Sequence, residues 1–111
     1  MSKKIIYTKH IEKGRFYIRG DSKGGHPSLI ILKNDRKNIY VALVFTSSKT
    51  PGTIRLKGSI DLDYPKKKYY MHILPYTGKR RDFGRKPLLR LRICDSDKQL
   101  IKILKKRFTD M

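Results

Sequence analysis

Short hydrophobic runs separated by turn-forming residues recur along most of the chain. Residues 15–19 alternate, so that Phe16 and Ile18 fall on one side of an extended segment and the flanking arginines fall on the other. Further runs with the character of strands cover residues 28–32, 39–45, 53–56, 69–74 and 88–93. Many short strands at close spacing are typical of a small barrel or sandwich. The pattern therefore predicts a mainly β domain, in which the most hydrophobic run, residues 39–45, is a central strand.

The hydrophobic period changes near the C-terminus, after the acidic segment 95–97. Apolar residues there recur at helical spacing, with lysines on the opposite side, and they are Leu100, Ile101, Leu104 and Phe108. Asp95 or Ser96 is the predicted N-cap. We expect one C-terminal helix that closes a twisted antiparallel sheet.

A length of 111 residues predicts one domain with a modest core, spanning residues 1–111. We expect residues 1–10 and 78–87 to be its flexible segments. The chain carries 28 Lys and Arg against 9 Asp and Glu, a net charge of +19. Self-repulsion of this size is tolerated most easily beside a polyanion. Nucleic-acid phosphates, an acidic protein or an anionic membrane surface all fit as partners.

Cysteine and histidine usage narrows the chemistry further. The single cysteine, Cys94, excludes an intrachain disulfide, and no two histidines have the spacing of a metal-binding pair. We therefore expect neither a metal nor a cofactor. No apolar run approaches the ~20 residues that span a bilayer, and the N-terminus lacks the hydrophobic region of a signal peptide. These features predict a cytoplasmic protein without a membrane segment.

Two segments carry the residues best suited to chemistry. A Gly-Gly-His-Pro turn enters the strand at 28–32, and a Thr-Ser-Ser-Lys sequence follows the strand at 39–45. Neighbouring antiparallel strands bring the start of one beside the end of the other. This arrangement would gather the imidazole of His26, the hydroxyls of Thr46 and Ser47, and the ammonium of Lys49 on one rim of the sheet. Such a rim is suited to handling a phosphodiester.

Basic and aromatic residues suggest how a nucleic acid would be held. Arg19, Lys23 or Lys49 could hold a phosphate near the rim, with arginine preferred for its bidentate geometry. A dense basic segment offers further phosphate contacts, through Lys79, Arg80, Arg81, Arg85 and Lys86. Three tyrosines between basic residues are candidates for base stacking, namely Tyr69, Tyr70 and Tyr76. His72 lies in an alternating strand and is interpreted as a half-buried structural residue.

These motifs resemble the MazF/PemK family of toxin endoribonucleases. Members have a strand that opens with a Gly-x-Arg-Pro-type turn, matched here by residues 25–32, and a later Thr-x-x-Ser-Lys-like loop, matched by residues 45–49. The strand at 53–56 and the helix containing 100–102 also fit, so the resemblance spans roughly residues 14–108. Two departures stand out. The family's catalytic arginine before proline is His26 here, and the preceding loop is shortened.

The resemblance implies an SH3-like barrel and a metal-independent endoribonuclease that is the toxin of a toxin–antitoxin pair. It further implies a homodimer that is inhibited by an acidic antitoxin protein. In such a reaction the ribose 2′-OH attacks the phosphate of single-stranded RNA. His26 would be the general base or acid, because histidine titrates near neutrality, and Thr46 and Ser47 would donate hydrogen bonds to phosphate oxygens.

Two other functional classes remain open. A non-catalytic, basic, RNA-binding SH3-like module, such as a ribosome-associated or a phage or plasmid accessory protein, would use the same surface without chemistry at His26. A DNA-binding protein ranks last, because nothing resembles a helix-turn-helix and the predicted helix is needed to close the barrel.

Overall fold

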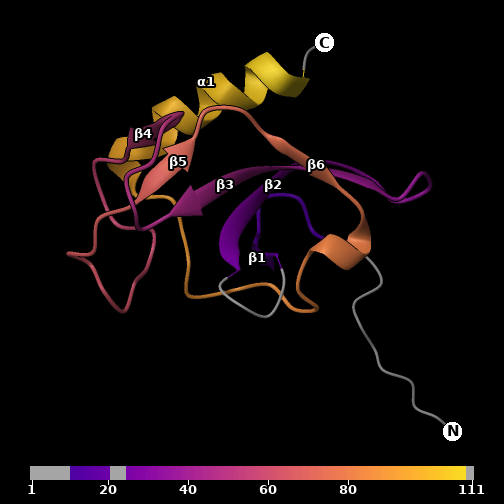
Figure 1. Cartoon of the computed structure of the whole chain (residues 1–111), viewed down its shortest axis with the longest axis horizontal. Helices are drawn as coiled ribbons and strands as arrows, with labels where there is room; N and C mark the ends of the chain where they lie inside the picture. Colours follow the sequence, from indigo (N-terminus) through magenta and orange to yellow (C-terminus); the bar gives the residue numbers. More distant parts are fainter. Residues whose placement is uncertain (1–10, 21–24, 110–111) are drawn as a thin grey trace, which may run out of the picture.

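The computed structural model describes residues 11–20 and 25–109 of the chain. The elements follow in this order: β1 (Phe16–Arg19), β2 (His26–Asn34), β3 (Ile39–Thr46), β4 (Thr53–Arg55), β5 (Tyr70–His72), β6 (Tyr76–Gly78), the 3₁₀ helices η1 (Arg80–Asp82) and η2 (Asp95–Asp97), and α1 (Lys98–Thr109). Across these residues the fold is mainly β with one C-terminal α-helix, which confirms the fold class predicted from the hydrophobic pattern (Figure 1). Residues 1–10 and Lys23 lie outside the described residues.

The sheet is antiparallel and is organised around the β2–β3 hairpin. Its strand order is β1-β2-β3-β5-β4, and β6 pairs with the same edge of β3 as β5, nearer the start of β3. The hairpin turn ends at Asn38, which has φ 56°, a left-handed conformation that asparagine adopts more readily than most residues. β3 is thus the central strand expected from its hydrophobicity.

The two faces of the hairpin pack against two separate hydrophobic clusters. Leu29, Ile31, Leu43 and Phe45 belong to a larger core that also contains residues of α1. Ile30 and Ala42 belong to a second core, completed by Ile11, Tyr17, Tyr40 and Phe83. Successive side chains of a strand point to opposite faces. The continuous apolar runs of β2 and β3 therefore supply both cores at once, as buried strands do.

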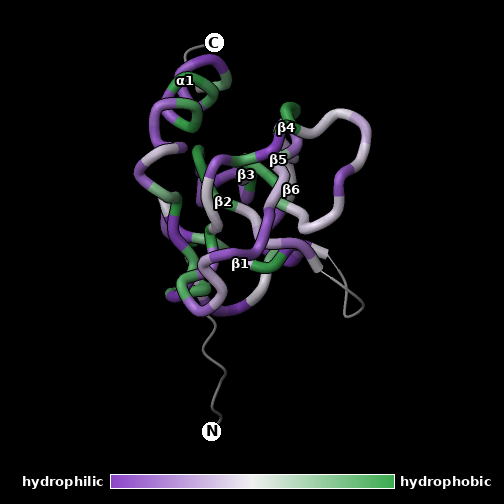
Figure 2. The backbone as a smooth tube through the Cα atoms, turned by 90° about the vertical axis from the view of Figure 1, so that its left-hand side faces the viewer, coloured by the Kyte–Doolittle hydropathy of each residue, from purple (hydrophilic) through white to green (hydrophobic). Residues whose placement is uncertain are grey.

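Helix α1 lies on one side of the sheet, with hydrophobic and hydrophilic stretches alternating along it (Figure 2). Ile101 and Leu104 are buried in the larger core. The predicted N-cap was wrong, because Asp95 and Ser96 form part of η2 and α1 begins after it. The carboxylate of Asp97 instead accepts hydrogen bonds from the backbone N–H groups of Lys57 and Gly58, at 2.8 and 2.9 Å. This contact fastens the start of α1 to the chain that follows β4.

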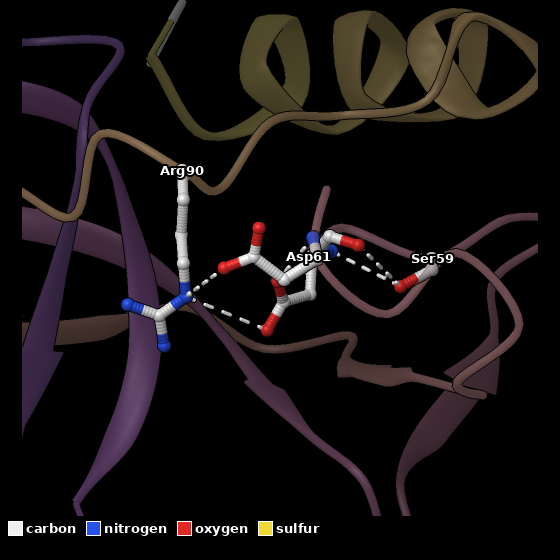
Figure 3. A network of polar contacts seen from close by, with 4 residues as sticks. Ser59, Asp61 and Arg90 are labelled. Carbon is white, nitrogen blue, oxygen red and sulfur yellow. Dashed lines mark hydrogen bonds and ion pairs between the residues drawn. The ribbon is translucent and has the colours of Figure 1, made fainter.

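Residues 88–93 do not form the predicted strand. They meet residues 60–62 through a single bridge between Asp61 and Leu91 and two backbone hydrogen bonds. A side-chain network reinforces this contact, since Arg90 Nε lies 3.6 Å from Asp61 Oδ2 and 3.8 Å from Asp63 Oδ2 (Figure 3). The prediction failed because the alternating apolar residues do not share one buried face: Leu91 is 7% exposed, whereas Leu89 is 64% exposed.

Residues 78–87, which the sequence predicted to be flexible, contain the end of β6 and the helix η1. After η1 the chain runs along the edge of β1 that is not paired with β2. Gly84 N–H donates to Ile18 O, and Leu88 N–H donates to Phe16 O, both at 2.7 Å. The chain thus passes from β6, on one side of the second core, to β1 on the other. This path closes the strands around that core.

Candidate functional site

A row of cross-strand neighbours carries several of the predicted site residues. Arg19 of β1 is the partner of His26 in β2, and Tyr70 of β5 is the partner of both Thr46 and Arg55. The register of β2 and β3 runs as far as Ser28 and Val44, so His26 and Thr46, each two residues further on, lie at the same end of the hairpin and on the same face. From β1 to β4 this row contains Arg19, His26, Thr46, Tyr70 and Arg55. Because paired residues point to the same face, these side chains share one side of the sheet.

His72 belongs to the next row on the same face. It is the partner of Thr53 and lies two residues after Tyr70 in β5. His72 and Arg19 both line a cleft of about 400 Å³, which we call the apolar cleft. Its other lining residues are Val44, Pro51, Gly52, Ile73, Leu74, Pro75 and Tyr76. The sequence indicated only a structural role for His72, because nothing local shows that β5 and β1 meet at one cleft.

Arg19 has an unusual environment for a surface arginine. Its guanidinium carbon lies 4.4 Å from the centroid of the Tyr76 ring, in cation–π geometry. The Tyr76 ring in turn packs edge-on against Phe83, with centroids 6.0 Å apart. The Nε atom of Arg19 is buried and has no hydrogen-bond partner in the structure. Leaving such a donor unpaired costs about 1–3 kcal/mol.

A second cleft adjoins the same arginine. It has a volume of about 360 Å³ and is lined by Arg19, Gly20, Tyr76, Arg81 and Asp82. We call it the arginine cleft. Arg19 and Tyr76 line both clefts and therefore stand between them.

The predicted rim residues differ in their exposure. Thr46 is only 6% exposed, and its Oγ1 accepts a hydrogen bond from the Ser48 N–H at 3.2 Å. This contact ends β3 in a local turn, as threonine commonly does at such positions. Ser47 and Lys49 are exposed, and His26 is half-buried at the start of β2. Ser47 is therefore more accessible to a substrate than Thr46.

Arg80 has a structural role in the basic segment. Its guanidinium donates to the backbone carbonyls of Phe83, Gly84 and Arg85, at 3.2, 3.0 and 3.1 Å. These bonds stabilise the turn after η1 and occupy the donors that a phosphate would need. The other basic residues of this segment are exposed, namely Lys79, Arg81, Arg85 and Lys86. Nothing in the sequence distinguishes Arg80 from them.

The predicted stacking tyrosines also separate. Tyr69 is 5% exposed and belongs to the larger core, with the Lys67 ammonium 5.3 Å from its ring centroid. Because its ring is buried, Tyr69 is not available to stack on a nucleic-acid base. Tyr70 and Tyr76 are half-buried on the face that carries Arg19 and His26.

A larger cavity lies elsewhere, between α1 and residues 88–93, with a volume of about 500 Å³. Its cations are Arg15, Arg92, Lys98, Lys102 and Lys105, and the rest of its described lining is glycine and hydrophobic residues. These described residues include no histidine or hydroxyl group and therefore offer no group suited to proton transfer near neutral pH. We place the candidate site at the two clefts beside Arg19.

Neither a group of metal ligands nor a membrane-spanning helix occurs in the described ranges. No three His, Cys, Asp or Glu side chains there are grouped as metal ligands. Within the same residues, no helix is both long and apolar enough to cross a membrane. In comparisons with known proteins, neither a family model nor a curated protein matches the sequence.

Proposed function

We propose that the protein is a metal-independent endoribonuclease that cleaves single-stranded RNA through attack of the ribose 2′-OH. The products would be a cyclic phosphate and a 5′-hydroxyl. The observation that carries the proposal is the apolar cleft, where Arg19 and His72 meet on the face that also carries His26. Together these residues provide one cation and two imidazoles, the side chain that general acid–base catalysis uses most often.

Each residue has a distinct task in this reaction. One imidazole removes the proton of the 2′-OH, and the other protonates the leaving 5′-oxygen. His26 and His72 are two strands and two residues apart, so their Cα atoms are separated by roughly 12 Å, and the proposal places the phosphodiester between their side chains. Arg19 stabilises the charge that develops on the phosphorane. The exposed hydroxyl of Ser47 donates a hydrogen bond at the rim, while Thr46 positions the turn that presents it.

The motifs shared with MazF/PemK toxins support assignment to a toxin–antitoxin pair. A net charge of +19 favours an acidic inhibitor that folds as it lies across the basic surface. The same resemblance favours a homodimer acting in the cytoplasm. In this chain the cationic role moves from the position before proline, now His26, to Arg19 on the adjacent strand.

Cleavage assays on single-stranded RNA test the proposal. His26→Ala and His72→Ala should each lower the cleavage rate about 10²–10⁴-fold, with little change in RNA affinity or melting temperature. Arg36→Gln is the matched control, because Arg36 is exposed in the turn at the far end of the hairpin. EDTA should not inhibit, and the products should carry a cyclic phosphate. Full activity in both histidine variants, or dependence on a divalent metal, would overturn the mechanism.

The alternative is a non-catalytic RNA-binding module. It is favoured by Thr46, whose hydroxyl serves a turn, and by the excess of cations over acidic residues. Both functions predict salt-dependent binding, with a log–log slope that steepens by about 0.7 for each phosphate neutralised on a single strand. Binding with such a slope, combined with no cleavage of any RNA tested, would identify the binding module.

A further inference from the structure

The stacked pair of Arg19 and Tyr76 divides two clefts of contrasting chemistry. On one side, the apolar cleft is walled by Val44, Pro51, Ile73, Leu74 and Pro75. On the other side, the described residues that line the arginine cleft are Gly20, Arg81 and Asp82 together with the pair itself, and none of them has an aliphatic side chain. An apolar space and a cationic space therefore share one wall.

A nucleotide has the same division within one molecule. Its base presents flat, largely apolar faces, and its phosphate presents charged oxygens that accept hydrogen bonds. We propose that the Arg19–Tyr76 pair holds one nucleotide of single-stranded RNA across it, with the base in the apolar cleft and the adjoining phosphate in the arginine cleft. This inference rests on the proposed function for the choice of RNA as ligand, but it requires no cleavage.

The phosphate subsite follows from the donors beside it. Arg19 and Arg81 both line this cleft, and Arg81 is exposed. Among the described lining residues Asp82 is the one that is acidic, and its Oδ2 accepts the Lys79 N–H at 2.8 Å. These described residues therefore carry two guanidinium groups against one engaged carboxylate. Contact with Tyr76 holds the plane of the Arg19 guanidinium, so its donors are oriented before a phosphate arrives.

The base subsite follows from the exposed lip of the apolar cleft. Leu74 is 72% exposed and Ile73 is 40% exposed, which leaves hydrophobic surface uncovered between β5 and β6. A base entering the cleft would cover this surface. The cleft is therefore also the place where a preference for particular bases would arise.

Titrations with small ligands that contain no internucleotide bond test this arrangement separately from catalysis. Nucleoside 5′-monophosphates, the corresponding nucleosides and inorganic phosphate are each titrated into the full chain, and binding is followed by backbone amide shifts. The monophosphates should bind about tenfold or more tightly than either fragment. The shifts should fall at β1, the β5–β6 connection and η1.

Two variants separate the subsites. Arg81→Gln should weaken binding of phosphate and monophosphate about tenfold, without affecting the nucleoside. Leu74→Asn should weaken binding of nucleoside and monophosphate, without affecting phosphate. Both side chains are exposed, so the fold should survive, and Arg36→Gln again serves as the control. Arg19→Lys should weaken phosphate binding while preserving the charge, because lysine lacks the planar fork.

The inference is overturned if Arg81→Gln leaves phosphate affinity unchanged, or if a monophosphate binds no better than its fragments. Shifts confined to the cavity beside α1 would equally refute it. An acidic peptide that displaces phosphate but not nucleoside would identify the arginine cleft as a protein-binding site instead. Loss of nucleotide binding in an active enzyme rejects this inference alone, whereas binding by an inactive protein rejects only the proposed catalysis.

Discussion

Replacement of Asp97 should reveal how strongly helix α1 depends on its attachment to the sheet. The carboxylate is 2% exposed and accepts two backbone N–H groups, from Lys57 and Gly58, at 2.8 and 2.9 Å. A hydrogen bond to a charged partner contributes about 1.5–3 kcal/mol. Asp97→Asn keeps one acceptor oxygen but turns an amide N–H₂ toward the second donor. We therefore expect a loss of about 2–3 kcal/mol in the free energy of unfolding for Asn, and about 3–5 kcal/mol for Asp97→Ala.

Urea unfolding followed by circular dichroism measures this difference. The midpoint should fall while the slope stays constant, because the surface exposed on unfolding is nearly unchanged. Asp95→Asn is the matched control, since the Asp95 side chain is 92% exposed and its Oδ1 forms an ion pair with the Lys98 ammonium at 2.8 Å. That variant should shift the midpoint far less. Equal midpoints for Asp97→Asn and Asp95→Asn would refute the structural role assigned to Asp97.

Three further predictions concern the hairpin and its cores. Burial and the hydrogen bond to Asp35 raise the pKa of Tyr40 to about 12 from 10.0. The stability that this pKa difference contributes is therefore complete below pH 10 and falls by about 2–3 kcal/mol as the pH rises to 12. In thermal melts across this pH range, Tyr40→Phe should remove that part of the alkaline loss of stability. Gly25→Ala should impair RNA cleavage and lower the melting temperature, because a Cβ there would lie 2.9 Å from Arg19 O; unchanged values for both would contradict this close approach of β1 and β2. Phe45→Ala should destabilise by about 3–5 kcal/mol in urea, since the ring is fully buried and packs against Phe16.

The local sequence determined those elements in which hydrophobic side chains recur at the regular spacing of a strand or a helix. The hydrophobic run at 39–45 predicted the central strand β3, and the helical spacing of Leu100, Ile101 and Leu104 predicted α1. Both signals arise because a strand or helix must bury a continuous face, and burial selects residue type position by position. The sequence also predicted that the start of β2 and the end of β3 share one end of the hairpin, since antiparallel pairing alone requires it.

Only the tertiary structure decided which residues meet at the candidate site. Arg19 and His72 are 53 residues apart in sequence (72 minus 19), yet they line one cleft because β1 and β5 flank the hairpin and the chain folds back at β6. Arg80 and Arg81 are adjacent and chemically identical, but η1 turns the first guanidinium onto three carbonyls and leaves the second exposed. Strand order and the direction of a long side chain depend on contacts between distant segments. No local pattern of hydrophobic and polar residues encodes those contacts.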